Sequence, residues 1–306
     1  MREVLVSKMT ATRPAKTAGV LLLAGFTAMR ARAQQPAPPA PLPEVHAFLE
    51  EVRRNLRSDE ALLSQYTFTE KLLERHFDGQ GAVTKTKSEV YEVYPSLEPG
   101  HTYRKLIMRD GTPVSAKELA QQDHDKDAEI EKQARKLAAE GAGARARREA
   151  DEKRKEEEIA AEVFRVYNIT LVGREVLGGR DTIQLRFDPR EDYRPSEKTG
   201  KILKKFKGRA WIDEADHQVA RIETELIDTL SFGLGVVARL KPGARVFFAR
   251  RKINDEVWLP SEARFTGRAR LFLIKALSID ALSEYSDYRK FSVGTDVEYS
   301  PEKPTQ

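Results

Sequence analysis

The chain has no cysteine among its 306 residues. This absence excludes structural disulfides, thiolate metal sites, a cysteine nucleophile and the lipid-modified cysteine that follows a lipoprotein signal. Stability must therefore come from burial of apolar side chains. The roughly 220 residues outside the tails and one charged segment are enough to build a single sizeable core.

Long apolar runs are also absent, and the one short run lies near the start. Basic residues including Arg2 and Lys8 precede apolar residues 18–26, and small residues ending at Ala33 follow. This order is typical of a cleaved export signal, and about nine residues is well below the ~20 of a spanning helix. We expect residues 1–33 to be a signal peptide and the mature protein to be periplasmic or secreted, without a lipid anchor.

The basic excess of the whole chain disappears with the signal. Residues 1–33 hold six of the 53 basic and one of the 48 acidic residues, which leaves 47 of each. A pI near 9.2 is therefore no sign of a nucleic-acid partner. We expect none, and we expect no membrane span after cleavage.

Motifs that carry catalysis or metal binding are lacking. There is no Gly-x-Ser-x-Gly elbow and no phosphate-binding Gly-x-x-x-x-Gly-Lys loop. The histidines are far apart, and the Asp123-His124-Asp125 triplet lies in a charged run that is typical of a solvated helix. We predict no catalytic residue, no metal and no cofactor, hence no enzyme. An envelope enzyme stays open as a third alternative, for which the sequence nominates no residue.

We predict that the chain consists of one domain with a tail at each end. Residues 34–43 form a proline-rich spacer, and residues 44–293 form a single domain that begins with an amphipathic helix up to about residue 63. Residues 115–162 are predicted to be a charged helical insertion, interrupted near residues 141–143, because half of this stretch is charged. Residues 294–306 are predicted to be a loose tail.

The rest of the domain has the period-2 alternation of strands. The clearest example runs from Val257 to Leu273, where one face is uncharged and the other carries arginines. A strand this long must curl, and Gly267 is its expected bend point. We predict an α+β fold, mainly antiparallel, in the form of a strongly curved, half-open β barrel with covering helices. The predicted strands are 66–72, 84–94, 103–108, 164–177, 182–187, 206–212, 219–227, 257–273 and 285–293.

Several of these strands resemble those of a known family. Gly-Arg-Ala-Trp-Ile-Asp at 208–213, Val-Ala-Arg-Ile-Glu at 219–223, Val-Trp-Leu-Pro at 257–260 and the closing residues 285–291 resemble the periplasmic lipoprotein-carrier superfamily, the LolA and LolB-like proteins. Residues 110–115 resemble its uncharacterised exported relatives. The resemblance implies a curved barrel whose concave face, covered by helices, holds acyl chains. The charged insertion is not part of that pattern, and no functional residue is transferred.

Apolar residues of the strands are the candidates for the concave face, either as ligand contacts or as plain core. The leading hypothesis is a carrier that shields an acyl chain, a lipoprotein or another apolar ligand. The alternative is a structural or interaction protein of the cell envelope with a solid core, which binds a protein partner through the charged helix. The candidate ligand-binding residues are Phe68, Leu72, Ile222, Leu226, Phe248, Leu259, Phe265 and Leu271.

Overall fold

The computed structural model describes residues 41–55, 63, 65–96, 102–232, 237–271 and 275–290. The chain divides into two units, Met1–Pro41 and Leu42–Gln306, and every element below belongs to the second. The expected signal peptide, most of the spacer and the tail lie outside the described residues. The predicted end of the first helix, residues 56–62, and the end of the last strand, residues 291–293, lie outside them too.

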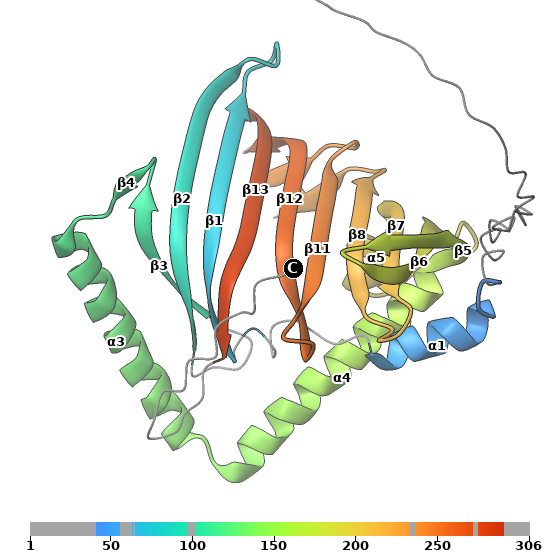
Figure 1. Cartoon of the computed structure of the whole chain (residues 1–306), viewed down its shortest axis with the longest axis horizontal. Coiled ribbons are helices and arrows are strands. Elements are labelled where there is room, and N and C mark those ends of the chain that lie inside the picture. The colour runs from blue at the N-terminus through green and yellow to red at the C-terminus, as the bar shows by residue number, and fades with distance from the viewer. Residues whose placement is uncertain are drawn as a thin grey trace, which may run out of the picture. The chain divides into compact units, whose positions relative to one another are not determined.

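The strands form one antiparallel sheet. Their order is β4-β3-β2-β1-β13-β12-β11-β8-β7-β6-β5, with β10 pairing with β12 and with β9. Among the described strands none joins β4 to β5, so the sheet stays open, and Figure 1 shows it turning at the β8 to β5 end. The predicted half-open antiparallel barrel with covering helices is therefore confirmed. The strands are β1 Tyr66–Phe77, β2 Val83–Pro95, β3 Thr102–Arg109, β4 Thr112–Pro113, β5 Tyr167–Leu177, β6 Arg180–Pro189, β7 Phe206–Asp213, β8 Val219–Leu226, β9 Leu230–Phe232, β10 Ala238–Leu240, β11 Arg245–Ile253, β12 Val257–Leu271 and β13 Lys275–Lys290.

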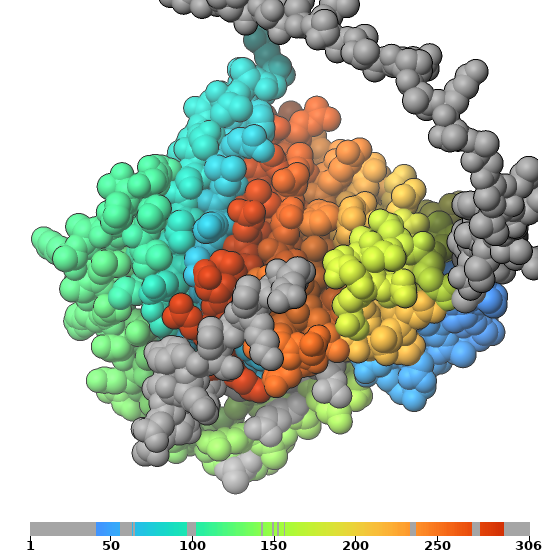
Figure 2. Space-filling model, viewed as in Figure 1, coloured from blue at the N-terminus to red at the C-terminus, as the bar shows by residue number. Residues whose placement is uncertain are grey.

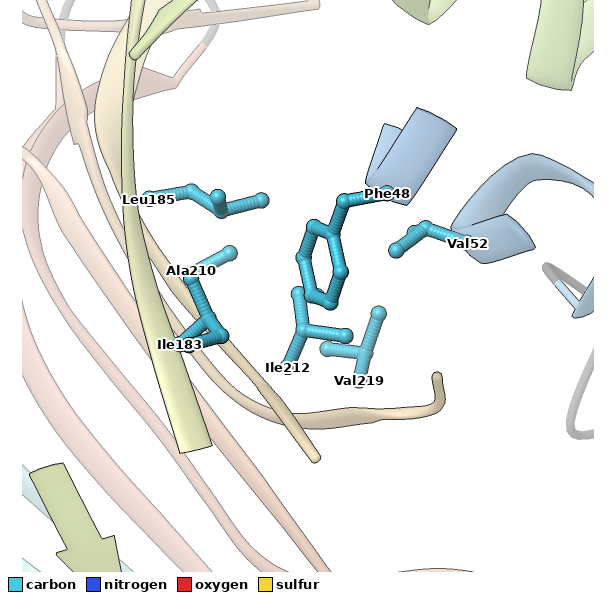
Figure 3. Close-up of a cluster of buried hydrophobic side chains, with 7 residues drawn as sticks. All are labelled: Phe48, Val52, Ile183, Leu185, Ala210, Ile212 and Val219. Atoms are coloured by element: carbon cyan, nitrogen blue, oxygen red, sulfur yellow. The ribbon is translucent and has the colours of Figure 1, made fainter. Parts of the chain in front are cut away.

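Helix α1 (Val45–Asn55) covers one face of this sheet at β6, β7 and β8. Phe48 and Val52 are four residues apart, so both point to the same side of the helix, and both are buried. We call this side of the sheet the helix-covered face and the other the open face. Figure 3 shows the two α1 side chains packed on the strand residues Ile183, Leu185, Ala210, Ile212 and Val219.

Two further clusters of buried side chains lie elsewhere in the sheet. The tyrosine cluster joins β1, β2, β11, β12 and β13, and the third cluster receives Ile202 from the short helix α5 (Lys198–Leu203). In Figure 2 the surface of β12 and β13 is in view between β1 and β2 on one side and α5 on the other. The tyrosine cluster is Tyr66, Phe68, Val93, Ile253, Leu259 and Tyr288, and the third cluster is Leu226, Leu230 and Ala244.

The predicted charged insertion consists of two helices. Helix α3 (Ala116–Ala139) begins after Ser115, whose hydroxyl accepts a hydrogen bond from the Glu118 N–H at 3.2 Å, as a capping residue does. Helix α4 (Ala142–Val166) follows a break at Glu140 and Gly141, close to the predicted interruption.

Several strands differ from the prediction: β9, β10 and β11 were not predicted, β1 and β6 are longer than expected, and two boundaries differ by more. Residues 164–166 were expected to begin a strand, but they complete α4, because Ala160 and Val166 are buried in its last two turns. Strand β13 begins at Lys275, ten residues before the predicted start at Tyr285. Its early part pairs with β12 along its length, although its sequence mixes polar and apolar residues without a clean alternation.

Candidate functional site

On the helix-covered face, one residue from each of five neighbouring strands lies directly opposite the next. Neighbouring strands are about 4.8 Å apart, so the four steps span about 19 Å. We call these residues the central row. In the order β8, β11, β12, β13, β1 they are Ile222, Phe248, Ala263, Ser283 and Leu72.

The central row is half-buried, unlike the packed clusters of the same sheet. At one end Ile222 packs against the cluster under α1. Four of the five side chains are apolar, and apolar area that is removed from water stabilises a complex by about 0.8 kcal/mol per methylene. The row therefore offers a narrow apolar track across the strands.

The other end of the row is polar. Glu89 of β2 lies opposite Leu72 and binds the Lys87 ammonium group at 2.8 Å. Glu70, two residues before Leu72, binds Arg104 at 2.9 Å and accepts a hydrogen bond from the Ser283 hydroxyl at 3.1 Å. Both carboxylates are buried. Such buried charges are stable because each has a cationic partner and a hydrogen bond.

The electrostatics of this end favour a charged Glu89 carboxylate beside protonated tyrosines. Burial raises the pKa of Glu89, but hydrogen bonds from Lys87 and Tyr91 more than offset it, so that this pKa is lowered overall. Burial and then the hydrogen bond to Glu89, 2.5 Å long, raise the pKa of Tyr91 to about 12. Burial and then the charge of Glu70 raise the pKa of Tyr285.

Two cations at this end remain accessible. The Lys87 side chain is 38% exposed and the Arg104 side chain 43%, although each binds a buried carboxylate. An ammonium and a guanidinium group can both bind an added carboxylate or phosphate. The arrangement, an apolar track that ends at two exposed cations, has the shape and polarity of a site for a chain with an anionic head.

The structure divides the predicted ligand-binding residues among four places. Leu72, Ile222 and Phe248 belong to the central row. Phe68 and Leu259 belong to the tyrosine cluster, and Leu226 is fully buried in the third cluster, against which Phe265 packs. Leu271 is the last residue of β12, and its backbone pairs with Ala238.

Sequence reasoning missed the polar end of the row. It found the uncharged face of β12, but in β1 the same face carries Glu70 and Glu74, between and after the apolar residues Phe68 and Leu72. The period-2 pattern of β1 contained that signal. Ser283 has no signal of its own, because only the register of β13 places it in the row.

Both tryptophans lie on the open face. Trp258 lies on the face of β12 opposite to that of Leu259, and its indole N–H donates to Asp216 at 2.9 Å. The Trp211 indole N–H donates to Glu175 at 2.6 Å. The tryptophans are therefore fixed by one carboxylate of the edge strand β5 and one of the turn between β7 and β8, and they take no part in the central row.

The described residues include neither a metal-binding cluster nor a membrane-spanning helix. No group of three or more His, Asp or Glu is placed there to hold a metal ion. None of the described helices is both long enough and apolar enough to cross a membrane.

The sequence matches no family model. It also has no match among curated proteins. Solved structures that it resembles include a domain named for outer membrane lipoprotein sorting from Vibrio parahaemolyticus, with 11% identity and a TM-score of 0.32 over 83% of this chain and 95% of the other. A LolA superfamily protein from Nitrosomonas europaea has 11% identity and a TM-score of 0.28 over 83% and 96%.

The Pseudomonas aeruginosa MucA/MucB complex also resembles it, with 12% identity and a TM-score of 0.22 over 84% of this chain and 99% of the other. The strands predict a likeness to LolA-type proteins. This likeness is confirmed, because such proteins are among the solved structures that the chain resembles. At these scores the likeness carries no argument about ligand, activity or partner.

Proposed function

We propose that the protein is a non-enzymatic, exported binding protein that shields one acyl chain along the central row. The polar head of the ligand lies at Lys87 and Arg104. The ligand is a fatty acid or the acyl chain of a lipid or lipoprotein. What carries this proposal is the half-buried apolar row that ends at two accessible cations.

The expected binding energy is compatible with a carrier. At ~0.8 kcal/mol per methylene, a chain of ~14 carbons gains on the order of 10 kcal/mol before ordering costs. The ends of the row support the orientation of the ligand. The α1 cluster at Ile222 is apolar, whereas the two cations are on β2 and β3 at the other end, so an anionic head and an apolar tail have separate places.

Native mass spectrometry with lipid extraction tests the proposal on the full chain, exported and purified without harsh detergent. We expect bound acyl species at close to one per chain, and extraction should identify the chain class. A bare mass that does not change after incubation with fatty acids or lipopeptides contradicts the proposal.

A second candidate function is protein binding through the charged helices. Helix α3 has no buried residue, and its outer side is a dense mixture of both charges. Deleting residues 121–160 is a poor test because it removes Gln122, which binds Leu106 of β3 near one end of the sheet. Charge reversal at Glu131 and Arg135, exposed and paired only with each other in the described structure, is sharper. Loss of a partner with acyl binding unchanged favours this second candidate.

A further inference from the structure

A groove of about 570 Å³ lies across β6, β7, β8, β11 and β12. Its side chains alternate with those of the central row along each strand, so the groove is on the open face, as Phe247 beside Phe248 shows. It is therefore separate from the acyl site. Its two cross-strand rows are Arg186, Arg209, Glu223, Phe247 and Arg264, and Lys207, Glu225, Arg245 and Thr266.

Four cations of this groove have no carboxylate partner. Within the described part of the chain, Lys207, Arg209, Arg245 and Arg264 form no ion pair, whereas most of the other charged strand residues near them do. In the register, Glu225 lies opposite both Lys207 and Arg245, and Glu223 lies opposite Arg209. In the described structure neither carboxylate forms an ion pair with a cation that it faces. The guanidinium and ammonium groups of the four cations are therefore available to an anionic ligand.

The carboxylates of the groove are mostly neutralised by other residues. Glu223 is paired with Arg221, and Asp188 is paired with Arg186 at 2.9 Å. Glu225 is the remaining carboxylate that lines the groove. Among the described residues that line the groove, four cations and one carboxylate therefore form no ion pair, which leaves an excess of positive charge.

The spacing of the cations favours an extended ligand over a single small anion. Arg209 and Arg264 are three strand steps apart, about 14 Å, and Lys207 and Arg245 are two steps apart, about 10 Å. In an extended peptide, side chains at i and i+4 are on one side and about 13 Å apart. The half-buried ring of Phe247 lies between the cations and adds an apolar contact.

We infer that this cationic groove binds a short, extended, acidic peptide segment of a partner protein. Its carboxylates pair with Arg209, Arg264, Lys207 and Arg245, and the segment lies across the strands. This site and the acyl site are on opposite faces of the sheet, so substitutions can abolish binding at either site without affecting the other.

A labelled peptide of about ten residues that alternates Glu and Ala tests the inference by fluorescence anisotropy with the full mature chain, at about 0.05 M salt to limit screening. The matching Gln and Ala peptide should not bind. The double variant R209Q/R264Q should weaken binding by about tenfold or more. The control R268Q/R270Q removes the same charge from exposed residues of β12 outside the groove and should leave binding unchanged.

Three results overturn the inference. The first is no binding of the Glu peptide, and the second is an equal loss in both double variants, which would indicate bulk charge alone. The third is binding of phosphatidylglycerol vesicles that R209Q/R264Q abolishes, without peptide binding, which would assign the groove to a membrane surface. Acyl binding, measured in parallel, should be the same in all variants, so failure here leaves the proposed function standing.

Discussion

The side-chain amide of Gln122 takes the place of a neighbouring strand for Leu106. Its nitrogen donates to the Leu106 carbonyl at 3.0 Å, and its oxygen accepts from the Leu106 N–H at 2.8 Å. Strand β3 is near one end of the sheet and pairs with the short β4 only at Met108 and Arg109. Helix α3 thereby protects an edge that would otherwise be open to other chains.

Replacing Gln122 with leucine should destabilise the fold by about 1 to 3 kcal/mol, because two backbone groups of Leu106 lose their partner. The edge that this change opens should also promote self-association. Urea unfolding and analytical ultracentrifugation measure the two effects. Gln121→Leu is the matched control, since Gln121 is exposed and binds only Asp125 of its own helix. Equal stability of the two variants would refute the edge role.

Asp213 should be the most sensitive carboxylate on the open face. It is 1% exposed, and it binds the Arg180 guanidinium through two bonds of 2.6 and 2.9 Å and the Asp216 N–H at 2.8 Å. Asp213→Asn keeps the shape but removes the charge, so we expect a loss of about 2 to 3 kcal/mol in thermal or urea unfolding. Asp181→Asn, at an exposed position of β6, should change stability by less than about 0.5 kcal/mol.

The carboxylate of Glu89 should make the stability of the fold partly sensitive to acid. Its pKa is lowered in the folded state from the ordinary 4.5, so its contribution to stability is complete above pH 4.5 and is lost as the pH falls through the lowered value. The stability difference between the wild type and Glu89→Gln should therefore shrink below pH 4.5. Urea unfolding at several pH values measures it, and a difference that does not depend on pH would speak against a charged Glu89.

The sequence predicted the fold class because strand alternation and helix spacing are local signals. The alternation of β8 and β12 and the capping residue Ser115 are read directly from neighbouring residues. The start of β13 could not be read, because its early residues become a strand through pairing with β12 and β1. Likewise, Phe164 is an aromatic residue of the kind that is common in strands, but the packing of the end of α4 makes it helical.

The candidate site was predicted only in part, for the same reason. Period-2 patterns assign a residue to a face of its own strand, and only the register of the sheet places Leu72, Ile222 and Phe248 in one row. These patterns cannot say which strands are neighbours, so they could not distinguish the central row from the buried positions of Leu226 and Leu259. The cations at Lys87 and Arg104 join the row only through the order of β1, β2 and β3.

Phe247 and Phe248 are consecutive residues of β11 on opposite faces, and together they give the most direct test of an acyl site on the helix-covered face. Titration of a fluorescent fatty acid into the wild type, Phe248→Ala and Phe247→Ala measures its affinity, with thermal unfolding as a check on folding. We predict a loss of about tenfold or more for Phe248→Ala, since ~1.4 kcal/mol is tenfold, and no loss for Phe247→Ala. Equal affinities of the two folded variants would contradict the account.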